Sequence, residues 1–467
     1  MSLKTFRDPH ISRWQSAVEE VLNRKEGTGT GGTAVRPTLD HPVVAAATAA
    51  GSAALSGIST AASTTTAPAK AAPAGCTDTE CAHLALQLAT ARIEHRPEAE
   101  IQQLEDSLRF SACDPLWAEA VTEYIQHFDV DKGTIPYRLS TGPDDPAPLT
   151  LPENATVALI ADWGTGTAEA KALLERVAAH KPDVLIHLGD VYYSGTTSEN
   201  ARYLLDLVNE VLGRGPANPV PVFNMTGNHD MYSGGGPFYD LLGKLNQPPL
   251  APPGQMQTHS FFGLRSSRWQ LLGMDTGLHD SDVFDVATDM TYLEDTELAW
   301  HKHQIASAGG RRTILLSHHQ LFSAFNQIGP KDNPDRTMNT LLRSQFGDVL
   351  DSVEAWFWGH EHNLEIYAPY AGLRRGRCIG CSAVPVFAAQ EPYKVCAGGD
   401  KIPMLPANPA IPGIPVMLGT TGGVYNHGYV ILKLDDAGGT ATVSYYQDTG
   451  IQDTGIGDLL FQETLGG

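Results

Sequence analysis

The sequence is poor in cysteine and in cations, and each shortage excludes a class of protein. Six cysteines among 467 residues are too few for a disulfide-stabilised scaffold. Lys and Arg total 32 against 53 Asp and Glu, which gives a formal charge of −21. A field of that sign repels nucleic acid and anionic membranes, so we expect neither as a partner. A small phosphate ester stays compatible with this charge, because bound metal ions can reverse its sign locally.

Long apolar runs are also missing. Residues 1–10 contain no apolar stretch of the kind that a secretory signal needs, which favours a cytoplasmic protein. Residues 42–69 consist mainly of Ala, Ser, Thr and Gly, so this segment is too weakly apolar for a membrane span. Nothing in the sequence indicates the oligomeric state.

The N-terminal third differs in texture from the rest of the chain. Apolar residues recur at helical spacing over 11–25, and helices are also expected over 79–128. Between them, Ala, Thr, Ser, Gly and Pro dominate residues 27–75, which indicates a loosely ordered arm. We therefore expect a mostly helical N-terminal region over 1–150, with this arm inside it, followed by a second domain over 151–467.

Beyond that boundary, short β-rich runs alternate with helical segments. Strands are expected at 156–161, 184–188 and 220–226, with helices over 167–180 and 198–213 between them. Further strands are expected at 258–264, 269–274, 313–317, 355–358, 365–368, 377–383, 428–434 and 440–446. The first pattern predicts an α/β fold with a largely parallel, helix-covered sheet. The later strands follow one another without helices, which indicates antiparallel additions or a second sheet.

Polar residues follow directly after five of these strands, at the edge where open α/β folds build their sites. The segments are Asp162-Trp163-Gly164, Gly189-Asp190-Val191-Tyr192-Tyr193, Gly227-Asn228-His229-Asp230, His318-His319 and Gly359-His360-Glu361-His362. Oxygen donors mixed with imidazoles suit iron, manganese or zinc. The set is too large for one ion with an open position, whereas two metals that share a carboxylate fit it. Such metal pairs hydrolyse phosphate esters.

The five segments in this order resemble the calcineurin-like metallophosphoesterases over roughly residues 154–447. This resemblance implies a four-layer αββα fold, in which two packed mixed β-sheets are flanked by helices. Most members have Asp-x-His at the first motif, but this chain has Gly164 where the His would stand. Its second motif supplies a phenol instead, as Gly-Asp-x-x-Tyr ending at Tyr193. Loss of the His together with gain of the Tyr is the purple acid phosphatase pattern.

The resemblance assigns a metal-binding role to seven side chains. They are Asp162, Tyr193 and His362 for the first metal, Asn228, His318 and His360 for the second, and Asp190 as the bridge between them. A phenolate favours Fe(III) as the first ion, and the second would be Fe(II), Zn(II) or Mn(II). A metal-bound hydroxide would then attack the phosphorus of a phosphomonoester. The enzyme would thus be a metal-dependent phosphoric ester hydrolase of the acid phosphatase type.

Two histidines are candidates for proton transfer or substrate contact. His229 would hydrogen-bond the phosphoryl group or protonate the leaving oxygen, as the resemblance implies. His319 has an open role, since contact with substrate or with a ligand and a plain surface position are equally compatible with the sequence. We expect Asp230 to support His229.

Several alternatives stay open. Tyr192 could supply the phenol in place of Tyr193. The same metals could serve a phosphodiesterase or a nucleotide hydrolase, and the helical arm could instead belong to a non-catalytic interaction protein. Arg374, Arg375 and Arg377 could grip a substrate anion, although a solvated basic loop is the simpler reading.

Overall fold

The structure is a computed structural model that describes residues 91, 96–97, 100–101, 123–281, 290–386, 388–409, 411–448 and 455–466. The chain divides into two compact units, Met1–Gly133 and Thr134–Gly467. In the first unit the structure describes the π-helix η1 (Ile125–Val130). The expected helix over 11–25 and the arm over 27–75 lie outside the described residues. Residues 134–150, which the sequence places in the N-terminal region, belong to the second unit.

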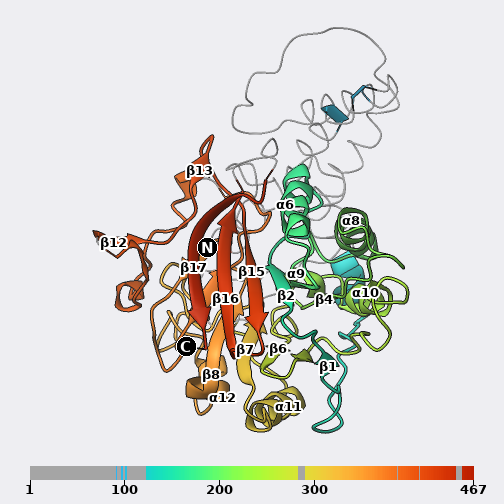
Figure 1. The fold of residues 1–467 in the computed structure, drawn as a ribbon, viewed down its shortest axis with the longest axis horizontal. Helices are drawn as coiled ribbons and strands as arrows, with labels where there is room; N and C mark the ends of the chain where they lie inside the picture. The colour runs from blue at the N-terminus through green and yellow to red at the C-terminus, as the bar shows by residue number, and fades with distance from the viewer. Residues whose placement is uncertain are drawn as a thin grey trace. The chain divides into compact units, whose positions relative to one another are not determined.

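One sheet of the second unit has six strands in the order β17-β16-β15-β2-β3-β4. β2, β3 and β4 run parallel, as the alternation of strands and helices predicts, whereas β15 to β17 add antiparallel strands beside β2. The strands are β2 (Thr156–Ile160), β3 (Val184–His187), β4 (Val222–Asn224), β15 (Gly428–Asp435), β16 (Thr440–Gln447) and β17 (Asp458–Leu465). Figure 1 shows β15, β16 and β17 side by side.

The other large sheet has seven strands in the order β1-β5-β6-β7-β8-β10-β9. β6, β7 and β8 run parallel at its centre. The strands are β1 (Leu149–Thr150), β5 (Phe262–Arg265), β6 (Trp269–Gly273), β7 (Arg312–Ser317), β8 (Val353–Trp358), β9 (Leu364–Ile366) and β10 (Gly376–Ile379). Two short hairpins lie outside the sheets: β11 (Pro406–Asn408) with β12 (Ile411–Pro415), and β13 (Thr420–Thr421) with β14 (Val424–Tyr425).

Helices connect the strands of both sheets. Those that follow the six-stranded sheet's parallel strands are α6 (Ala168–Ala179), α7 (Thr197–Glu199), η2 (Asn200–Leu205), α8 (Asp206–Val211), α9 (Asn228–Met231) and α10 (Gly236–Leu245). Those that accompany the seven-stranded sheet are α11 (Asp295–Ala306), α12 (Thr340–Phe346) and η3 (Leu350–Ser352), and the short turns η4 (Ala388–Gln390) and η5 (Gly399–Lys401) follow later. Thr167 caps α6 and Asn339 caps α12, each by accepting a hydrogen bond from a backbone amide in the first turn.

Three buried apolar clusters define the layers. The largest lies between the sheets and includes Val157, Ile186, Ile314, Phe357 and Val430. A second lies between the six-stranded sheet and its helices, with Ala158, Leu185, Leu173, Val208 and Leu241. A third lies between the seven-stranded sheet and α11 and α12, with Leu315, Trp356, Trp300 and Leu342. The order helix, sheet, sheet, helix confirms the expected α/β fold with two mixed sheets flanked by helices.

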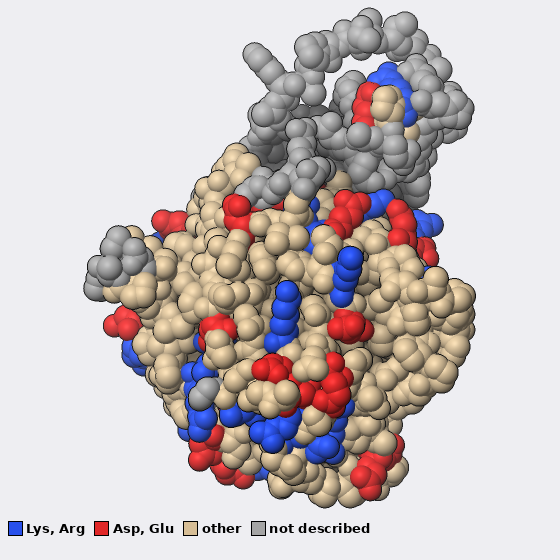
Figure 2. Space-filling model, viewed as in Figure 1, with Lys and Arg blue, Asp and Glu red and all other residues tan. Residues whose placement is uncertain are grey.

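Charged side chains of both signs lie on the face of the molecule that carries β15 to β17. Figure 2 shows Lys and Arg interspersed with Asp and Glu there, so the acidic excess does not form one patch on this face. Among the described residues, no helix combines the length and apolar character needed to cross a bilayer.

Candidate metal centre

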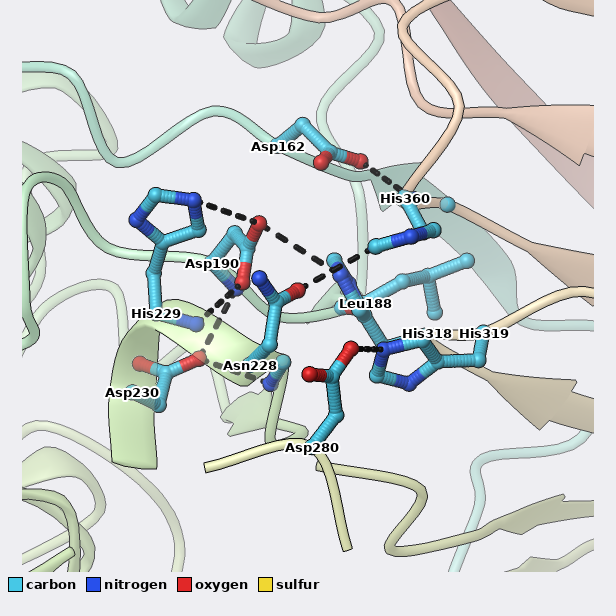
Figure 3. A network of polar contacts seen from close by, with 12 residues as sticks. Asp162, Leu188, Asp190, Asn228, His229, Asp230, Asp280, His318, His319 and His360 are labelled. Atoms are coloured by element: carbon cyan, nitrogen blue, oxygen red, sulfur yellow. Dashed lines mark hydrogen bonds and ion pairs between the residues drawn. The ribbon is translucent and has the colours of Figure 1, made fainter. Parts of the chain in front are cut away.

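The polar segments that follow β2, β3, β4, β7 and β8 converge on one place at the carboxyl ends of these strands (Figure 3). Ligand atoms of Asp162, Asp190 and His318 lie within 4.8 Å of one another, and so do those of His318, His319 and His360. His318 belongs to both groups and thus joins them. The sequence predicted this convergence, because the carboxyl ends of parallel strands meet at one edge of a sheet.

The backbone is strained where these loops meet. Asp162, Asp190 and His360 have φ of 54°, 74° and 65°, in the left-handed region that side chains with a Cβ rarely adopt. Gly227 allows the close approach, since a Cβ on this residue would lie 2.0 Å from Oδ1 of Asp190. A Cβ on Gly359 would lie 2.6 Å from Oδ2 of Asp162. The glycines of the third and fifth motifs are therefore needed to let carboxylate and backbone approach closely.

Asp190 lies at the centre of the cluster and is 1% exposed. Its Oδ1 accepts a hydrogen bond from the amide of His229 at 3.0 Å, and its Oδ2 lies 3.4 Å from Nε2 of His318. Burial alone would raise the pKa of Asp190, but the positive charges of His318 and His229 bring it well below its usual range. Asp190 is therefore a buried carboxylate that keeps its negative charge.

Asp162 faces the same space from the end of β2. Its Oδ1 lies 3.3 Å from Nε2 of His362, and its Oδ2 accepts a hydrogen bond from the amide of His360 at 2.9 Å. Asp162 is completely buried. The structure thus brings Asp162 and His362 together, as expected for ligands of one ion.

His318 presents one bare ring nitrogen to the carboxylates. Its Nδ1 donates to the carbonyl of Leu188 at 2.9 Å, so in the neutral ring Nε2 carries the lone pair. This Nε2 is buried and has no hydrogen-bond partner among the described residues. Burial alone would lower the pKa of His318, but the charges of Asp190 and Asp162 raise it to about 9. The two carboxylates therefore attract positive charge at this position.

Asn228 and His360 form the other side of the cluster. Oδ1 of Asn228 lies 3.1 Å from Nδ1 of His360, and Nδ2 of Asn228 donates to the hydroxyl of Tyr232 at 2.6 Å. The amide oxygen, which is the atom that can bind a cation, thus points toward the imidazole. These are two of the three ligands that the sequence assigns to the second metal.

His229 lies at the edge of the site, and its side chain is 20% exposed. Its Nδ1 donates to the carbonyl of Tyr193 at 2.6 Å, which leaves Nε2 facing Oδ2 of Asp190 at 3.9 Å. The nitrogen that can exchange a proton therefore faces the centre of the cluster.

The phenol that contacts the carboxylates belongs to Tyr192. Its hydroxyl lies 3.0 Å from Oδ1 of Asp162, 3.0 Å from Oδ2 of Asp190 and 3.1 Å from Nε2 of His362. Burial and the two carboxylates raise the pKa of Tyr192 well above its usual range in this arrangement. Tyr193, the residue predicted from the motif spacing, contributes its amide to Glu199 and its carbonyl to His229. Tyr193 as a metal ligand stays a prediction.

His319 is held by residues that the sequence reading missed. Its Nε2 lies 3.0 Å from Oδ2 of Asp280, its Nδ1 lies 3.1 Å from the hydroxyl of Thr276, and its ring lies 4.4 Å from that of His360. Burial and the charge of His318 hold the pKa of His319 well below its usual range. The structure thus engages both ring nitrogens within the protein, and a catalytic role for His319 stays a prediction.

Two further carboxylates support the loops without facing the cluster centre. Oδ2 of Asp230 accepts from the amides of Asp190 and Gly227, each at 2.8 Å, so it ties the second motif to the third. We expected Asp230 to support His229, but these contacts are to the backbone. Glu361 accepts from the hydroxyl of Ser323 at 2.8 Å and anchors the loop between His360 and His362.

The residues fit a pair of cations. The bare Nε2 of His318 is buried beside two carboxylates, and an amide oxygen and further imidazoles surround it. Mixed oxygen and imidazole donors without thiolate are typical of iron, zinc and manganese sites.

Comparison with known proteins agrees with this site. Residues 155–364 match the family model of the calcineurin-like phosphoesterases. Residues 155–364 are therefore similar to this family. The matched segment includes all five motifs, from Asp162 to His362. A search of curated proteins finds no match to the sequence.

Two solved structures align with this chain at low identity. A purple acid phosphatase from yellow lupin (Lupinus luteus) seeds is 13% identical, with a TM-score of 0.43, over 66% of this chain and 53% of that chain. GAP50, the anchor in the inner membrane complex of Plasmodium, is 13% identical, with a TM-score of 0.38, over 67% of this chain and 88% of that chain. The chain thus spans about half the length of the lupin phosphatase.

Proposed function

We propose that the protein is a phosphatase of the purple acid phosphatase type that hydrolyses phosphomonoesters with two metal ions. The observation that carries the proposal is the buried Nε2 of His318, which lies 3.4 Å from Oδ2 of Asp190 and has no hydrogen-bond partner among the described residues. A bare imidazole nitrogen beside an ionised carboxylate is a position for a cation. The similarity of residues 155–364 to the calcineurin-like phosphoesterases supports a hydrolytic role for that cation.

The proposed ligands divide between two ions that share Asp190. They are Asp162, His362 and a tyrosine for the first ion, and Asn228, His318 and His360 for the second. The structure supports Tyr192 as that tyrosine, whereas the motif spacing of the family favours Tyr193. We infer Fe(III) beside the phenol and Fe(II), Zn(II) or Mn(II) at the second position. Such ions polarise phosphoryl oxygens and lower the pKa of water.

The proposed reaction also depends on the charge of Asp190 and on the free ring nitrogen of His229. Asp190 stays ionised in a buried position, because His318 and His229 lower its pKa. His229 holds its proton on Nδ1 against the carbonyl of Tyr193, which frees Nε2 to contact the phosphoryl group or to exchange a proton with the leaving oxygen. Asp162 and Asp190 are 0% and 1% exposed, so both carboxylates are shielded from bulk water.

Removal of a bridging or terminal ligand tests the proposal. In Asp190→Asn or His318→Ala, we expect hydrolysis of nitrophenyl phosphate to fall at least ~100-fold, with loss of bound metal measured by elemental analysis. His303→Ala is the matched control, because this histidine is exposed on α11. Full activity in either ligand variant, with both metals retained, would reject the assigned roles.

Two further measurements identify the substrate class and the ligand tyrosine. We expect nitrophenyl phosphate to be turned over faster than bis-nitrophenyl phosphate, and the reverse order would identify a phosphodiesterase. Iron-loaded protein should show the purple charge-transfer band of an Fe(III) phenolate. Spectra of Tyr192→Phe and Tyr193→Phe decide which phenol binds, since only loss of the ligand removes the band.

A further inference from the structure

We propose that Tyr232 is a positioning residue that fixes the amide of Asn228 with its oxygen toward the second metal ion. This inference rests on the proposed function, because it assumes that Asn228 binds an ion. No motif in the sequence marks Tyr232, which lies just after α9 and is 2% exposed.

The geometry follows from the local helix. α9 begins at Asn228, so Tyr232 comes four residues later and its side chain lies on the same face. The hydroxyl of Tyr232 accepts the Nδ2–H of Asn228 at 2.6 Å, while Oδ1 of the same amide lies 3.1 Å from Nδ1 of His360. The nitrogen of the Asn228 amide is therefore bonded to Tyr232, while its oxygen lies beside His360.

This division matters because an asparagine amide can turn. The terminal torsion of Asn is broad and roughly two-fold, so without a partner for Nδ2 the amide can exchange its two ends. The flipped amide would direct N–H donors at the cation and at the imidazole of His360, and neither is an acceptor in a metal-bound site. The Tyr232 hydroxyl stabilises the one orientation in which Asn228 can be a ligand.

The role of Tyr232 is specific to one ion. Asn228 and His360 both belong to the proposed second metal position, whereas Asp162 and His362 belong to the first. A second contact of Tyr232, with the ring of His229 at 4.9 Å, holds the tyrosine in place from the other side. Loss of the hydroxyl alone leaves this ring contact and the core packing intact.

The test is Tyr232→Phe in the full chain, with Zn²⁺ and Mn²⁺ as probes in chelator competition and elemental analysis. We expect the affinity for one of the two ions to fall about 10-fold, with the other unchanged, in the range typical of partners that orient metal ligands. Tyr239→Phe is the control, because its hydroxyl is also buried but contacts Ser260 at 3.2 Å. Thermal unfolding of both variants shows whether each is folded.

The Asn228→Asp variant separates the effect of amide orientation from the effect of side-chain packing. In Asn228→Asp, either carboxylate oxygen can bind the ion. In this variant, Tyr232→Phe should therefore lower the metal affinity by less than about 3-fold. An equal loss in both backgrounds, or unchanged affinity in Tyr232→Phe, would overturn the positioning role. Failure of the unaltered protein to bind any metal would instead reject the proposed function.

Discussion

At the scale of single residues, conformational strain is concentrated at the expected ligands. Asp162, Asp190 and His360 all have positive φ, a conformation that costs on the order of 1 kcal/mol or more per residue outside glycine. Hydrogen bonds compensate this cost: the amide of Asp190 donates to Asp230, and the amide of His360 donates to Asp162. The loops are thus held in a form that directs several charged groups at one point.

Asp436 is a buried carboxylate outside the candidate site that accepts several hydrogen bonds and thereby stabilises the fold. Its carboxylate accepts hydrogen bonds from the amide of Asn154 at 2.7 Å, the amide of Arg268 at 3.0 Å and the hydroxyl of Ser266. Burial would raise the pKa of Asp436, but these bonds hold it below its usual 3.8. Because the pKa is lower in the folded state, this stabilisation is complete above pH 3.8 and is lost as the pH falls through the folded value.

We expect Asp436→Asn to lower the free energy of unfolding at pH 7 by about 1–2 kcal/mol. The difference in the free energy of unfolding between this variant and the unaltered protein should become smaller at pH values below 3.8. Urea denaturation across this range measures both, with the exposed neighbour in Asp435→Asn as the control. A difference that stayed constant down to the most acidic pH would contradict a role for the ionised carboxylate.

Residues differ in how far the sequence could predict them. The sequence indicated the convergence of the proposed ligands at the strand ends, because Gly-Asp, Gly-Asn-His-Asp and Gly-His-Glu-His are local signals. The sequence offered Tyr192 only as an alternative to Tyr193, and it did not indicate the contacts of Asp280 and Tyr232, because these positions depend on how a loop turns after its strand. Asp280 reaches His319 from a different strand's loop, a contact that spans 39 positions in the sequence.

At the scale of elements, a buried ion pair joins the two sheets. Arg377 on β10 donates from Nε and Nη2 to the carboxylate of Glu463 on β17, at 2.8 Å and 2.7 Å. Arg377 is 1% exposed, and Tyr445 donates to the same carboxylate at 2.7 Å. The sequence favoured a solvated basic loop for Arg374, Arg375 and Arg377, which is wrong for Arg377. Its partner could not be foreseen, since β17 was not predicted.

Strand β17 escaped prediction for a physical reason. As the edge strand of the six-stranded sheet it is largely exposed, and Leu459 is 51% exposed, so its sequence lacks a clear apolar face. The buried strands β2, β3, β7 and β8 were predicted, because a short apolar run between turn residues indicates a strand covered on both faces.

Breaking this ion pair should destabilise the sheet interface. We expect Arg377→Met to cost about 1–3 kcal/mol, because Glu463 loses its bidentate partner and keeps the weaker contact with Arg375, whose Nε lies 3.4 Å from Oε2. In the double variant with Glu463→Leu, much of that loss should be recovered. Chemical denaturation of the two single variants and the double variant measures the coupling. Arg374→Met, at an exposed position of the same loop, should change the stability by less than about 0.5 kcal/mol.

At the scale of the whole molecule, the second unit contains every large apolar cluster that the structure describes. The core between the sheets extends from Leu151 to Leu465, and the two outer clusters lie within the same limits. The proposed metal ligands also lie in this unit. The composition of residues 1–150 predicted a separate N-terminal region. Residues 134–150 instead belong to the second unit, because β1 pairs with β5.

We therefore expect residues 134–467 to fold without the first unit. The isolated segment should unfold in one cooperative transition, with a midpoint within about 4 °C of the corresponding transition in the full chain, which corresponds to a loss of at most roughly 3 kcal/mol. Scanning calorimetry of both proteins measures this, and chelator competition shows whether the isolated segment binds metal as the full chain does. Aggregation or a non-cooperative transition would contradict independent folding of the second unit. Normal folding with altered turnover of nitrophenyl phosphate would instead assign the first unit a role in catalysis, because the metal ligands themselves would be unchanged.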